Sequence, residues 1–410
     1  MSTSRLFVFA VVVVIVALCN DSRGQVSDSK VPVDESRKPE NSIRFATFNI
    51  ALNRKKAGGL LEELKKTKEI DGRSIPQSQQ AKRIAEVIRR VQPDVLLINE
   101  LDEADKTLSV FVDNFLERSE AYSKAGYKYF YVAPVNTGVP TGIDLNGDGK
   151  KDGPEDAYGY GAFPGQYGMA VLSKYPIDKS KLRTFQKFLW KDMPDMKWPT
   201  NPETGKSFYS DQVKSMFRLS SKSHWDIPIK IGDKTIHFLV SHPTPPVFDG
   251  PEDRNGLRNA DEIRFWKDYV EGKNYIYDDE GKKGGLAEGS HFVIAGDLNA
   301  DPNDGDSTGN PMKKMLGHRL IAQNVSPASE GAAEASQDSG RANEKHQGNP
   351  AFDTGDFNDR NVGNLRIDYV LPSRSLKVVG QGVFWPAKNS RLKELNRASD
   401  HHLVWVDLEK

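Results

Sequence analysis

The stretch VIAGDLNADPNDGD, residues 293–306, leads an apolar run directly into a glycine, an acid and an amide. The apolar run predicts a buried strand. Asp297 and Asn299 follow at its end, where an ordinary Asp/Asn-rich turn would also place them, because such side chains bond their own backbone. The alternative is a strand whose end delivers a carboxylate and an amide into an active site. The rest of the chain has to decide between the two.

Polar residues end several other apolar runs. A carboxylate at the edge of a buried strand is costly unless it is paired, hydrogen-bonded or bound to a metal. In chain order the positions are Asn49 in TFNI, Glu100 in INELD, His242 in LVSHP, Asp297 and Asn299 in GDLN, Asp368 in LRIDYVLPS, and Asp400 with His401 in ASDHHLVWV. Each residue alone has a structural explanation as a turn residue, loop histidine, edge acid or cap. The ordered set is more specific than any single member.

Strand-like and helix-like segments alternate from Ser42 to the C-terminus. Residues 78–91 carry apolar side chains at helical spacing, and Pro93 ends that helix before an apolar strand. A second helix is expected over residues 259–272. Strands dominate, so we predict one α/β domain of two packed mixed β-sheets flanked by helices.

Two stretches are expected to form long surface loops, and long loops in a compact domain are often functional. Residues 135–166 are rich in Gly and Asp and are interpreted as an insertion in the domain that spans residues 42–410. Residues 327–361 are rich in Ala, Ser, Gly and Asn.

The composition limits the classes of function. Lys+Arg and Asp+Glu both number 57, so the net charge of the 410-residue chain is +0. No overall positive field attracts nucleic acid, which weakens a DNA-binding function without excluding a DNA-cutting one. Cys19 is the single cysteine, so a chain processed beyond it has no disulfide, thiolate metal site or cysteine nucleophile.

The N-terminus has the pattern of an export signal. One arginine precedes an apolar run over residues 6–19, which is short for a membrane span. We predict a signal peptide over residues 1–24, a polar linker over residues 25–41, a secreted or periplasmic location, and no transmembrane segment after cleavage. An uncleaved anchor is the alternative.

From RFATFNI, which begins at Arg44, to SDHHLVWVDL, which ends at Leu408, the chain resembles the endonuclease/exonuclease/phosphatase superfamily of deoxyribonuclease I-like proteins, as a secreted bacterial-type member. The resemblance implies a four-layered α/β sandwich with its active site where the strand ends of two sheets meet. It also implies a secreted, divalent-metal-dependent hydrolase of phosphate esters, with a phosphodiesterase or endonuclease favoured. A phosphomonoesterase is the alternative. A catalytically inactive binding module is disfavoured, because all of the matched positions are present.

The resemblance also implies a role for each matched position. His401 would be the catalytic histidine, and Asp368 would fix its tautomer and stabilise its charged form. Asp297 would orient or deprotonate water, and either His401 or Asp297 is the base. Asn299 and His242 would contact the phosphate. The metal positions would be Glu100, Asn49 and Asp400, for Mg²⁺ or Mn²⁺, which prefer hard oxygen ligands.

One departure separates the chain from deoxyribonuclease I itself. Where some nucleases carry an acid that pairs with the second histidine, FPGQYGMAVLS offers Gln166 and Tyr167.

The segment DLNGDGKKDGPE, residues 144–155, matches the twelve-residue calcium-loop pattern. The matching ligand positions are Asp144, Asn146, Asp148, Asp152 and Glu155. The flanking residues are not helical, so a full EF-hand is not expected. We predict a structural Ca²⁺ site, and an acidic surface loop is the alternative.

Arg254 and Arg258 are expected on a loop that leads into the second helix. Guanidinium groups there could grip a substrate phosphate, because arginine offers planar bidentate donors. Solvated charges near a helix start are the alternative. The chain is expected to act as a monomer on a phosphate-ester substrate, a class that includes nucleic acid.

Overall fold

The computed structural model describes residues 37–410 except residues 71–72, 119–123 and 339–341. The predicted signal peptide, residues 1–24, and the predicted linker up to residue 36 lie outside the described residues. At the end of that linker, Lys38 Nζ lies 2.7 Å from Asp94 Oδ2. This ion pair ties the beginning of the described chain to the domain.

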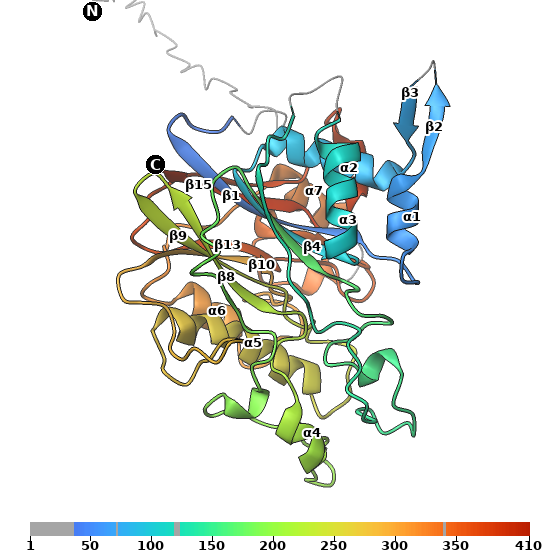
Figure 1. The fold of residues 1–410 in the computed structure, drawn as a ribbon, viewed down its shortest axis with the longest axis vertical. Helices are drawn as coiled ribbons and strands as arrows, with labels where there is room; N and C mark the ends of the chain where they lie inside the picture. The colour runs from blue at the N-terminus through green and yellow to red at the C-terminus, as the bar shows by residue number, and fades with distance from the viewer. Residues whose placement is uncertain (1–36, 71–72, 119–123, 339–341) are drawn as a thin grey trace, which may run out of the picture. The chain divides into compact units, whose positions relative to one another are not determined.

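A six-stranded sheet contains both ends of the described chain (Figure 1). Its strands, in spatial order, are β14 (Val378–Phe384), β15 (Leu403–Glu409), β1 (Ser42–Leu52), β4 (Val95–Leu101), β6 (Met169–Ser173) and β5 (Tyr129–Tyr131). β1 and β4 are parallel, and the other neighbours are antiparallel. The sheet is therefore mixed.

A five-stranded mixed sheet comes from the middle of the chain. In spatial order it contains β13 (Asp368–Pro372), β10 (His291–Asp297), β9 (Lys234–Ser241), β8 (His224–Ile231) and β7 (Arg183–Thr184). Here β9 and β10 are parallel and the other pairs are antiparallel. Two small ribbons pair β2 (Thr67–Ile70) with β3 (Arg73–Pro76) and β11 (Gly355–Asp356) with β12 (Asn364–Leu365).

Helices cover the outer faces of both sheets. The α-helices are α1 (Gly59–Lys65), α2 (Gln79–Val91), α3 (Ala104–Phe111), α4 (Asp211–Met216), α5 (Arg254–Val270), α6 (Pro311–Leu316) and α7 (Glu330–Asp338). A π-helical turn, η1 (Val112–Leu116), continues α3, and short 3₁₀ turns are η2 (Pro154–Asp156), η3 (Trp190–Asp192), η4 (Asn343–Lys345), η5 (Pro350–Phe352) and η6 (Lys393–Ala398). Buried side chains of α1, α2 and α3 pack on the six-stranded sheet, and those of α5 and α6 pack on the five-stranded sheet.

Three hydrophobic clusters separate these layers. An inner cluster lies between the two sheets, and an outer cluster lies between each sheet and its helices. The order helices, sheet, sheet, helices confirms the predicted four-layered α/β sandwich.

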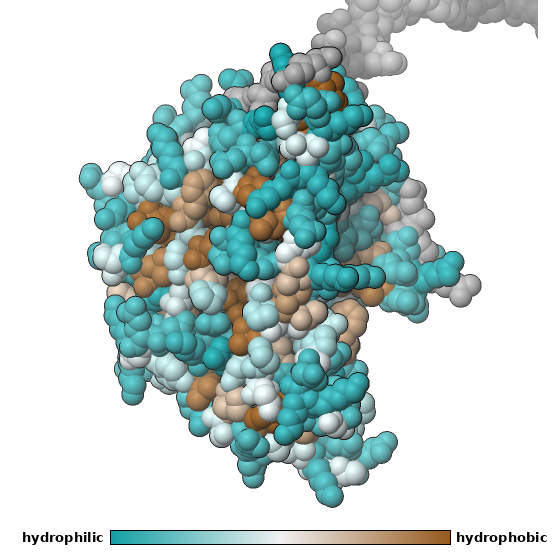
Figure 2. Space-filling model, turned by 45° about the vertical axis from the view of Figure 1, so that its right-hand side comes forward, coloured by the Kyte–Doolittle hydropathy of each residue, from teal (hydrophilic) through white to brown (hydrophobic). Residues whose placement is uncertain are grey.

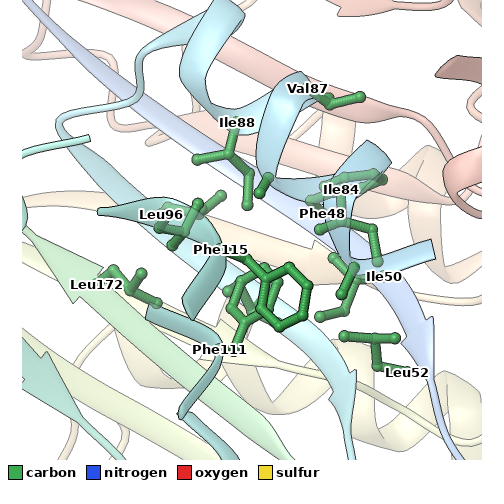
Figure 3. Close-up of a cluster of buried hydrophobic side chains, with 14 of the residues drawn as sticks. Phe48, Ile50, Leu52, Ile84, Val87, Ile88, Leu96, Phe111, Phe115 and Leu172 are labelled. Atoms are coloured by element: carbon green, nitrogen blue, oxygen red, sulfur yellow. The ribbon is translucent and has the colours of Figure 1, made fainter. Parts of the chain in front are cut away.

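Helix α2 shows why the predicted helix forms. Ser78 caps its start by accepting a hydrogen bond from the Ala81 N–H at 3.3 Å. Ile84 and Ile88, one turn apart, point into the outer cluster (Figure 3). Gln92 adopts a left-handed conformation at the C-cap, and Pro93 cannot continue the helix.

Two predictions about local structure are corrected. Residues 327–361 are not a plain loop, because they contain α7, η4, η5 and β11. The second predicted helix, residues 259–272, begins earlier, since α5 starts at Arg254. The stretch 135–166 forms turns and isolated bridges with one short 3₁₀ turn, η2, as expected for a loop-like segment.

Large hydrophobic side chains on the surface are dispersed rather than gathered. Among the described residues the exposed ones include Ile70, Tyr160, Phe248 and Val362, which come from separate parts of the chain. On the face shown in Figure 2, hydrophobic residues form small groups among hydrophilic ones.

Candidate active site

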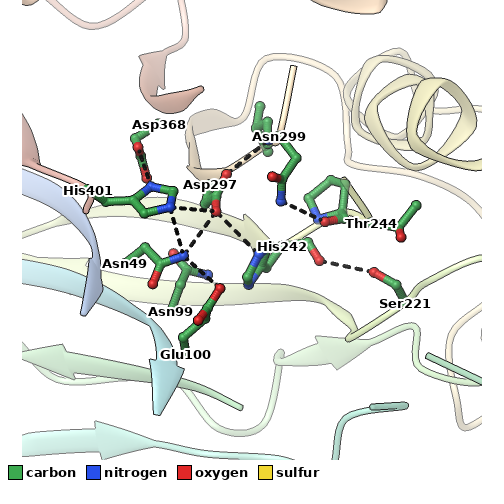
Figure 4. A network of polar contacts seen from close by, with 12 residues as sticks. Asn49, Asn99, Glu100, Ser221, His242, Thr244, Asp297, Asn299, Asp368 and His401 are labelled. Atoms are coloured by element: carbon green, nitrogen blue, oxygen red, sulfur yellow. Dashed lines mark hydrogen bonds and ion pairs between the residues drawn. The ribbon is translucent and has the colours of Figure 1, made fainter. Parts of the chain in front are cut away.

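At the end of several strands, a polar residue lies on the same inward-facing side as the apolar residues before it. In β10, Val293 and Ala295 face the inner cluster, and Asp297 is the next residue in that row. In β13, Val370 faces the inner cluster, and Asp368 lies two residues before it on the same face. The other inward positions of this kind are Asn49, after Phe45 in β1, and His242, after Phe238 and Val240 in β9. Because the two sheets face each other, these side chains meet at one end of the sandwich (Figure 4).

Glu100 reaches this site through a break in the alternation of β4. Leu96 and Ile98 face the outer cluster, so a regular strand would turn Glu100 outward as well. Instead Glu100 has a φ of +58°, and the pairing of β1 with β4 shifts register beside it. Leu101 then faces the outer cluster. The left-handed conformation of a non-glycine residue costs of order 1 kcal/mol and is found preferentially at functional sites.

Asp297 is the centre of the site. Its Oδ2 accepts a hydrogen bond from Asn49 Nδ2 at 3.0 Å and lies 3.3 Å from His242 Nε2 and 3.8 Å from His401 Nε2. Gly296 permits this arrangement, because a Cβ atom at that position would lie 2.0 Å from the Ser241 carbonyl oxygen. The glycine before Asp297 therefore lets the ends of β9 and β10 come together.

Two side chains in series, Asp368 and Thr354, hold His401. Its Nδ1 lies 2.9 Å from Asp368 Oδ2, and the Thr354 hydroxyl donates to the same oxygen at 2.8 Å. Thr354 Oγ1 also accepts the Asp368 N–H at 2.9 Å. Sequence reasoning missed Thr354, because it follows no apolar run and has no motif. The Nε2 of His401 is left facing Asp297.

Burial and neighbouring charges shift the protonation of these groups. Burial would lower the pKa of His401, but the carboxylates of Asp368 and Asp297 raise it well above its ordinary value. Burial would raise the pKa of Asp297, but the charge of His401 and hydrogen bonds from His242 and Asn49 hold it well below its usual range. Burial and the Asp297 charge raise the pKa of Asp368 to about 6, while His401 opposes them. The resulting state has an ionised Asp297 and a positively charged His401.

His242 differs from His401 in its surroundings. Burial and the charge of Lys222 lower the pKa of His242, which favours a neutral ring. Among the described residues, its Nδ1 is buried without a hydrogen-bond partner. Gln166 makes its hydrogen bonds elsewhere, because its Oε1 accepts the Ala162 N–H and its Nε2 donates to the Arg54 carbonyl oxygen.

The site also has the donor set for a divalent cation. Among the described residues, potential ligand atoms converge in two groups, one of Glu100, His242 and Asp297 and one of Asp297, Asp368 and His401, each within 4.8 Å. Buried carboxylate oxygens and His242 Nε2, which lies 3.3 Å from Asp297 Oδ2, fit a cation with oxygen and nitrogen ligands.

The other two predicted metal positions lie differently. Asn49 turns its Nδ2 toward Glu100, at 3.0 Å, and its Oδ1 accepts the Ala51 N–H at 3.1 Å. It therefore holds the acids together in this structure. Asp400 is exposed, belongs to neither group of converging ligands, and acts on His401 through its charge. An unpredicted residue, Asn53, donates to Glu100 Oε2 at 2.7 Å.

Asn299 links Asp297 to the chain after His242. Its backbone N–H donates to Asp297 Oδ1 at 3.0 Å, and its Nδ2 donates to the Pro243 carbonyl oxygen at 3.1 Å. Its φ of +52° places it in the left-handed region, which asparagine tolerates. Asp297 and Asn299 of GDLN are thus joined by a hydrogen bond, and Asn299 is also bonded to the segment after His242.

Arg254 and Arg258 lie in α5, so the prediction that they lie on a loop is wrong. The Arg258 guanidinium is buried and donates to the carbonyl oxygens of Leu219 at 2.8 Å and Tyr158 at 2.6 Å. Arg254 pairs with Glu252. Arg258 therefore uses its donors to join α5 to neighbouring segments.

The predicted calcium loop closes on its own backbone. Asp144 accepts the N–H groups of Gly147 at 2.6 Å and Gly149 at 2.8 Å. Asp156, outside the predicted ligand set, is buried and accepts the N–H groups of Leu145 and Gly153. The carboxylates of Asp152 and Glu155 do not converge with that of Asp144 into a group of the kind found at the active site, in the part of the chain that the structure describes.

Comparison with known proteins gives one family match. The model of the Endonuclease/Exonuclease/phosphatase family matches residues 46–401. No curated protein sequence matches the chain. Similar solved structures include an endonuclease/exonuclease/phosphatase from Beutenbergia cavernae, 18% identical with a TM-score of 0.46, covering 90% of this chain and 72% of that one. Another is the human Nocturnin catalytic domain with bound sulfate anion, 15% identical with a TM-score of 0.45, covering 91% and 98%. A family protein from Leptotrichia buccalis is 15% identical with a TM-score of 0.43, covering 90% and 100%.

Proposed function

The chain belongs to the Endonuclease/Exonuclease/phosphatase family of phosphate-ester hydrolases, and we propose that it cleaves phosphodiesters in a reaction that depends on a divalent metal. The observation that carries this proposal is the convergence on Asp297 Oδ2 of groups from both sheets. Asn49 lies in β1 of the six-stranded sheet, and His401 lies just before β15 of the same sheet. His242 follows β9 of the five-stranded sheet. Such a cluster can hold a water molecule and a phosphoryl group together.

Glu100, with His242 and Asp297 beside it, would hold Mg²⁺ or Mn²⁺. When bound, the cation supplies positive charge that offsets the charge on the phosphoryl oxygens. Asn49 and Asn53 fix the Glu100 carboxylate by hydrogen bonds of 3.0 and 2.7 Å. Asp400 adds negative charge beside His401 rather than a ligand in either converging group.

Asp297 and His401 divide the proton transfers in this proposal. A water oxygen bonds to phosphorus, its proton passes to the Asp297 carboxylate, and the bond from phosphorus to the leaving oxygen breaks. His401 Nε2 then gives a proton to the leaving oxygen. His401 lies between the carboxylates of Asp368 and Asp297, at 2.9 and 3.8 Å, and this position favours a charged ring that donates.

Hydrolysis of plasmid and of bis(p-nitrophenyl) phosphate with added Mg²⁺ tests the proposal. We expect wild-type cleavage, its loss on chelation, and a decrease of roughly 10³-fold or more in His401→Ala. His237→Ala is the matched control, because His237 also pairs with an aspartate, Asp226 at 2.7 Å, but in the middle of β9 rather than at its Ser241 end. Cleavage of p-nitrophenyl phosphate alone would favour the phosphomonoesterase, and hydrolysis of none of the three would overturn the assignment.

We also propose export of the chain. The support is the apolar run over residues 6–19, which follows one arginine. No helix in residues 37–410, apart from the three short stretches that the structure does not describe, is long and apolar enough to cross a membrane. N-terminal sequencing of protein recovered outside the cytoplasm should begin close to residue 25. A start at Met1 would contradict cleavage.

For the loop of residues 144–155 we propose Ca²⁺ binding, on the strength of its ligand pattern. Its acids already accept hydrogen bonds from backbone N–H groups, so calcium would have to displace several of these. The melting temperature of chelated protein should rise on addition of Ca²⁺ in wild type and not in Asp144→Ala. Equal melting temperatures with and without Ca²⁺ would refute the site.

A further inference from the structure

Lys222 is a buried lysine whose charge acts on His242 in the candidate active site. Strand β8 pairs antiparallel with β9, and His224 lies opposite Ser241. The chain just before His224 therefore runs past the residues just after Ser241, which include His242. Only 6% of the Lys222 surface is exposed. A lysine that is buried to this extent is normally paired.

None of the described residues is a direct partner of the Lys222 ammonium group. Among the described residues it forms neither an ion pair nor a hydrogen bond, although the charges of Glu100, Glu262 and Asp297 act on it. Glu262 is already engaged, since its two oxygens accept the N–H groups of Ser221 at 2.6 Å and Thr244 at 2.7 Å. Burial lowers the pKa of Lys222. A lysine side chain that is buried to this extent without an ion pair is costly, so its presence needs an explanation outside the stability of the fold.

The backbone around Lys222 is fixed on both sides. Its carbonyl oxygen accepts the Asn136 N–H at 2.8 Å, which joins it to the stretch 135–166. The preceding residue, Ser221, donates its hydroxyl to the His242 carbonyl oxygen at 3.2 Å. Because these hydrogen bonds fix the backbone at Lys222, its ammonium group is preorganised for an anion that enters the site.

Lys174 shows what a structural lysine looks like in the same protein. Burial also lowers the pKa of Lys174. Its Nζ, however, lies 3.5 Å from Asp94 Oδ1, just beyond the Ser173 end of β6. Because Ser173 pairs with Val95 at the start of β4, this ion pair lies at the opposite end of the strand from Glu100. Lys174 uses its charge inside the fold, whereas Lys222 does not.

We propose that Lys222 is a substrate-binding residue whose ammonium group donates hydrogen bonds to the non-bridging oxygens of the phosphate that is cleaved. The proposal deepens the proposed function and rests on it. A phosphate ester adds negative charge to a site that already contains the carboxylates of Glu100, Asp297 and Asp368, and Lys222 offsets that charge. Negative charge on these oxygens develops further as water adds to phosphorus, so the interaction strengthens toward the transition state.

Binding of inorganic phosphate to the full chain, measured by calorimetry, tests the role of Lys222 without any turnover. We expect Lys222→Met to weaken phosphate binding at least about tenfold, the equivalent of one charge-assisted hydrogen bond. Its melting temperature should fall by less than about 3 °C, because the variant removes an unpaired buried charge. Lys174→Met, the matched control, should bind phosphate like the wild type and be less stable. Unchanged phosphate affinity in Lys222→Met would overturn the proposal.

A measurement on the wild-type protein covers the case in which Lys222→Met fails to fold. Acetylation of each lysine is followed by peptide mass spectrometry with and without phosphate. Phosphate should slow acetylation of Lys222 and leave that of Lys174 unchanged, and an equal rate at Lys222 would overturn the proposal. If the chain hydrolyses no phosphate ester, the proposed function fails whatever these results are. If it hydrolyses a diester and phosphate affinity does not depend on Lys222, only this inference fails.

Discussion

Asn49 and Asp297 belong to different sheets, and the Asn49 amide donates to Asp297 Oδ2 across the sandwich at 3.0 Å. The same Nδ2 lies 3.0 Å from Glu100 Oε1. One amide therefore fixes the separation of two carboxylates that would otherwise repel each other.

Asn49→Ala should lower kcat for diester hydrolysis by roughly 10²-fold, because the two acids lose the donor that positions them. The buried carboxylates also lose a partner, so we expect unfolding free energy to fall by about 1–3 kcal/mol. Steady-state kinetics and urea denaturation measure the two effects. Asn114→Ala, which removes a bond to the Leu64 carbonyl oxygen in the outer helical layer, should leave kcat unchanged. Wild-type kcat in Asn49→Ala would show that the cross-sheet bond has no catalytic role.

Thr354→Val removes the hydroxyl that bonds Asp368 while keeping the shape of the side chain. Since Asp368 orients His401, kcat should fall by roughly 10- to 100-fold, as for other groups that orient a functional side chain. The hydroxyl lowers the pKa of Asp368, so the acidic limb of the pH–rate profile should move to higher pH in the variant. Thr354→Ser should restore both the rate and the profile. A fall in rate that serine does not reverse would point to packing rather than to the hydrogen bond.

Asp353 should make stability depend on pH. Burial, together with the charges of Asp301 and Asp304, raises its pKa from an ordinary 3.8 to about 8. The folded state then holds a proton that the unfolded state has released, so this group lowers stability progressively as pH rises from about 4 to about 8. Asp353→Asn should be more stable than wild type at pH 8 by about 1–3 kcal/mol and nearly equal to it at pH 4.

Urea denaturation at both pH values measures this difference. Asp105→Asn, at an exposed position in α3, should show the same difference from wild type at the two pH values. A difference for Asp353→Asn that does not grow with pH would mean that its carboxyl group is not held neutral.

Arg44 and Asp407 form an ion pair within the six-stranded sheet, with Nε–Oδ1 and Nη2–Oδ2 distances of 2.7 and 2.8 Å. Both residues are almost fully buried. Asp407→Asn removes the carboxylate that pairs with the buried Arg44 guanidinium and should cost about 3–5 kcal/mol of unfolding free energy. The pair is remote from His401, so kcat below the unfolding temperature should be unchanged. Surface variant Glu409→Gln, which breaks the exposed Lys377 pair, should cost less than about 1 kcal/mol.

The sequence predicted the layers and the strand ends that carry the candidate site, because both depend on strand patterning. Asp297 and Asp368 lie on the same face as the inward-facing apolar residues of their strands, and the alternation of inward and outward residues can be read from the sequence. Glu100 was predicted at the correct strand end, although simple alternation would have turned it outward. Its left-handed φ and the local register shift depend on the pairing of β1 with β4, which a single sequence does not show.

Residues that lie outside strands were harder to predict. Lys222 and Thr354 follow no periodic pattern, so only the folded chain shows which groups they approach. The start of α5 was placed too late because Asn255 and Gly256 disfavour a helix. In the structure a Cβ on Gly256 would lie 2.0 Å from Asp253 Oδ1 and 2.5 Å from Thr308 Oγ1, so the glycine serves close packing at this helix start. That error also led to the wrong placement of Arg254 and Arg258 on a loop.

Strand β15 follows all the other strands of the described chain, yet it lies between β14 and β1 in the interior of the six-stranded sheet. During translation, β1 therefore stays without this neighbour until residues 403–409 have left the ribosome. His401 precedes that strand by two residues and emerges just before it. A growing polypeptide accordingly lacks both the closed sheet and the histidine that faces Asp297 until those residues have been added. We therefore expect the six-stranded sheet and the cluster around Asp297 to be completed together, late in synthesis.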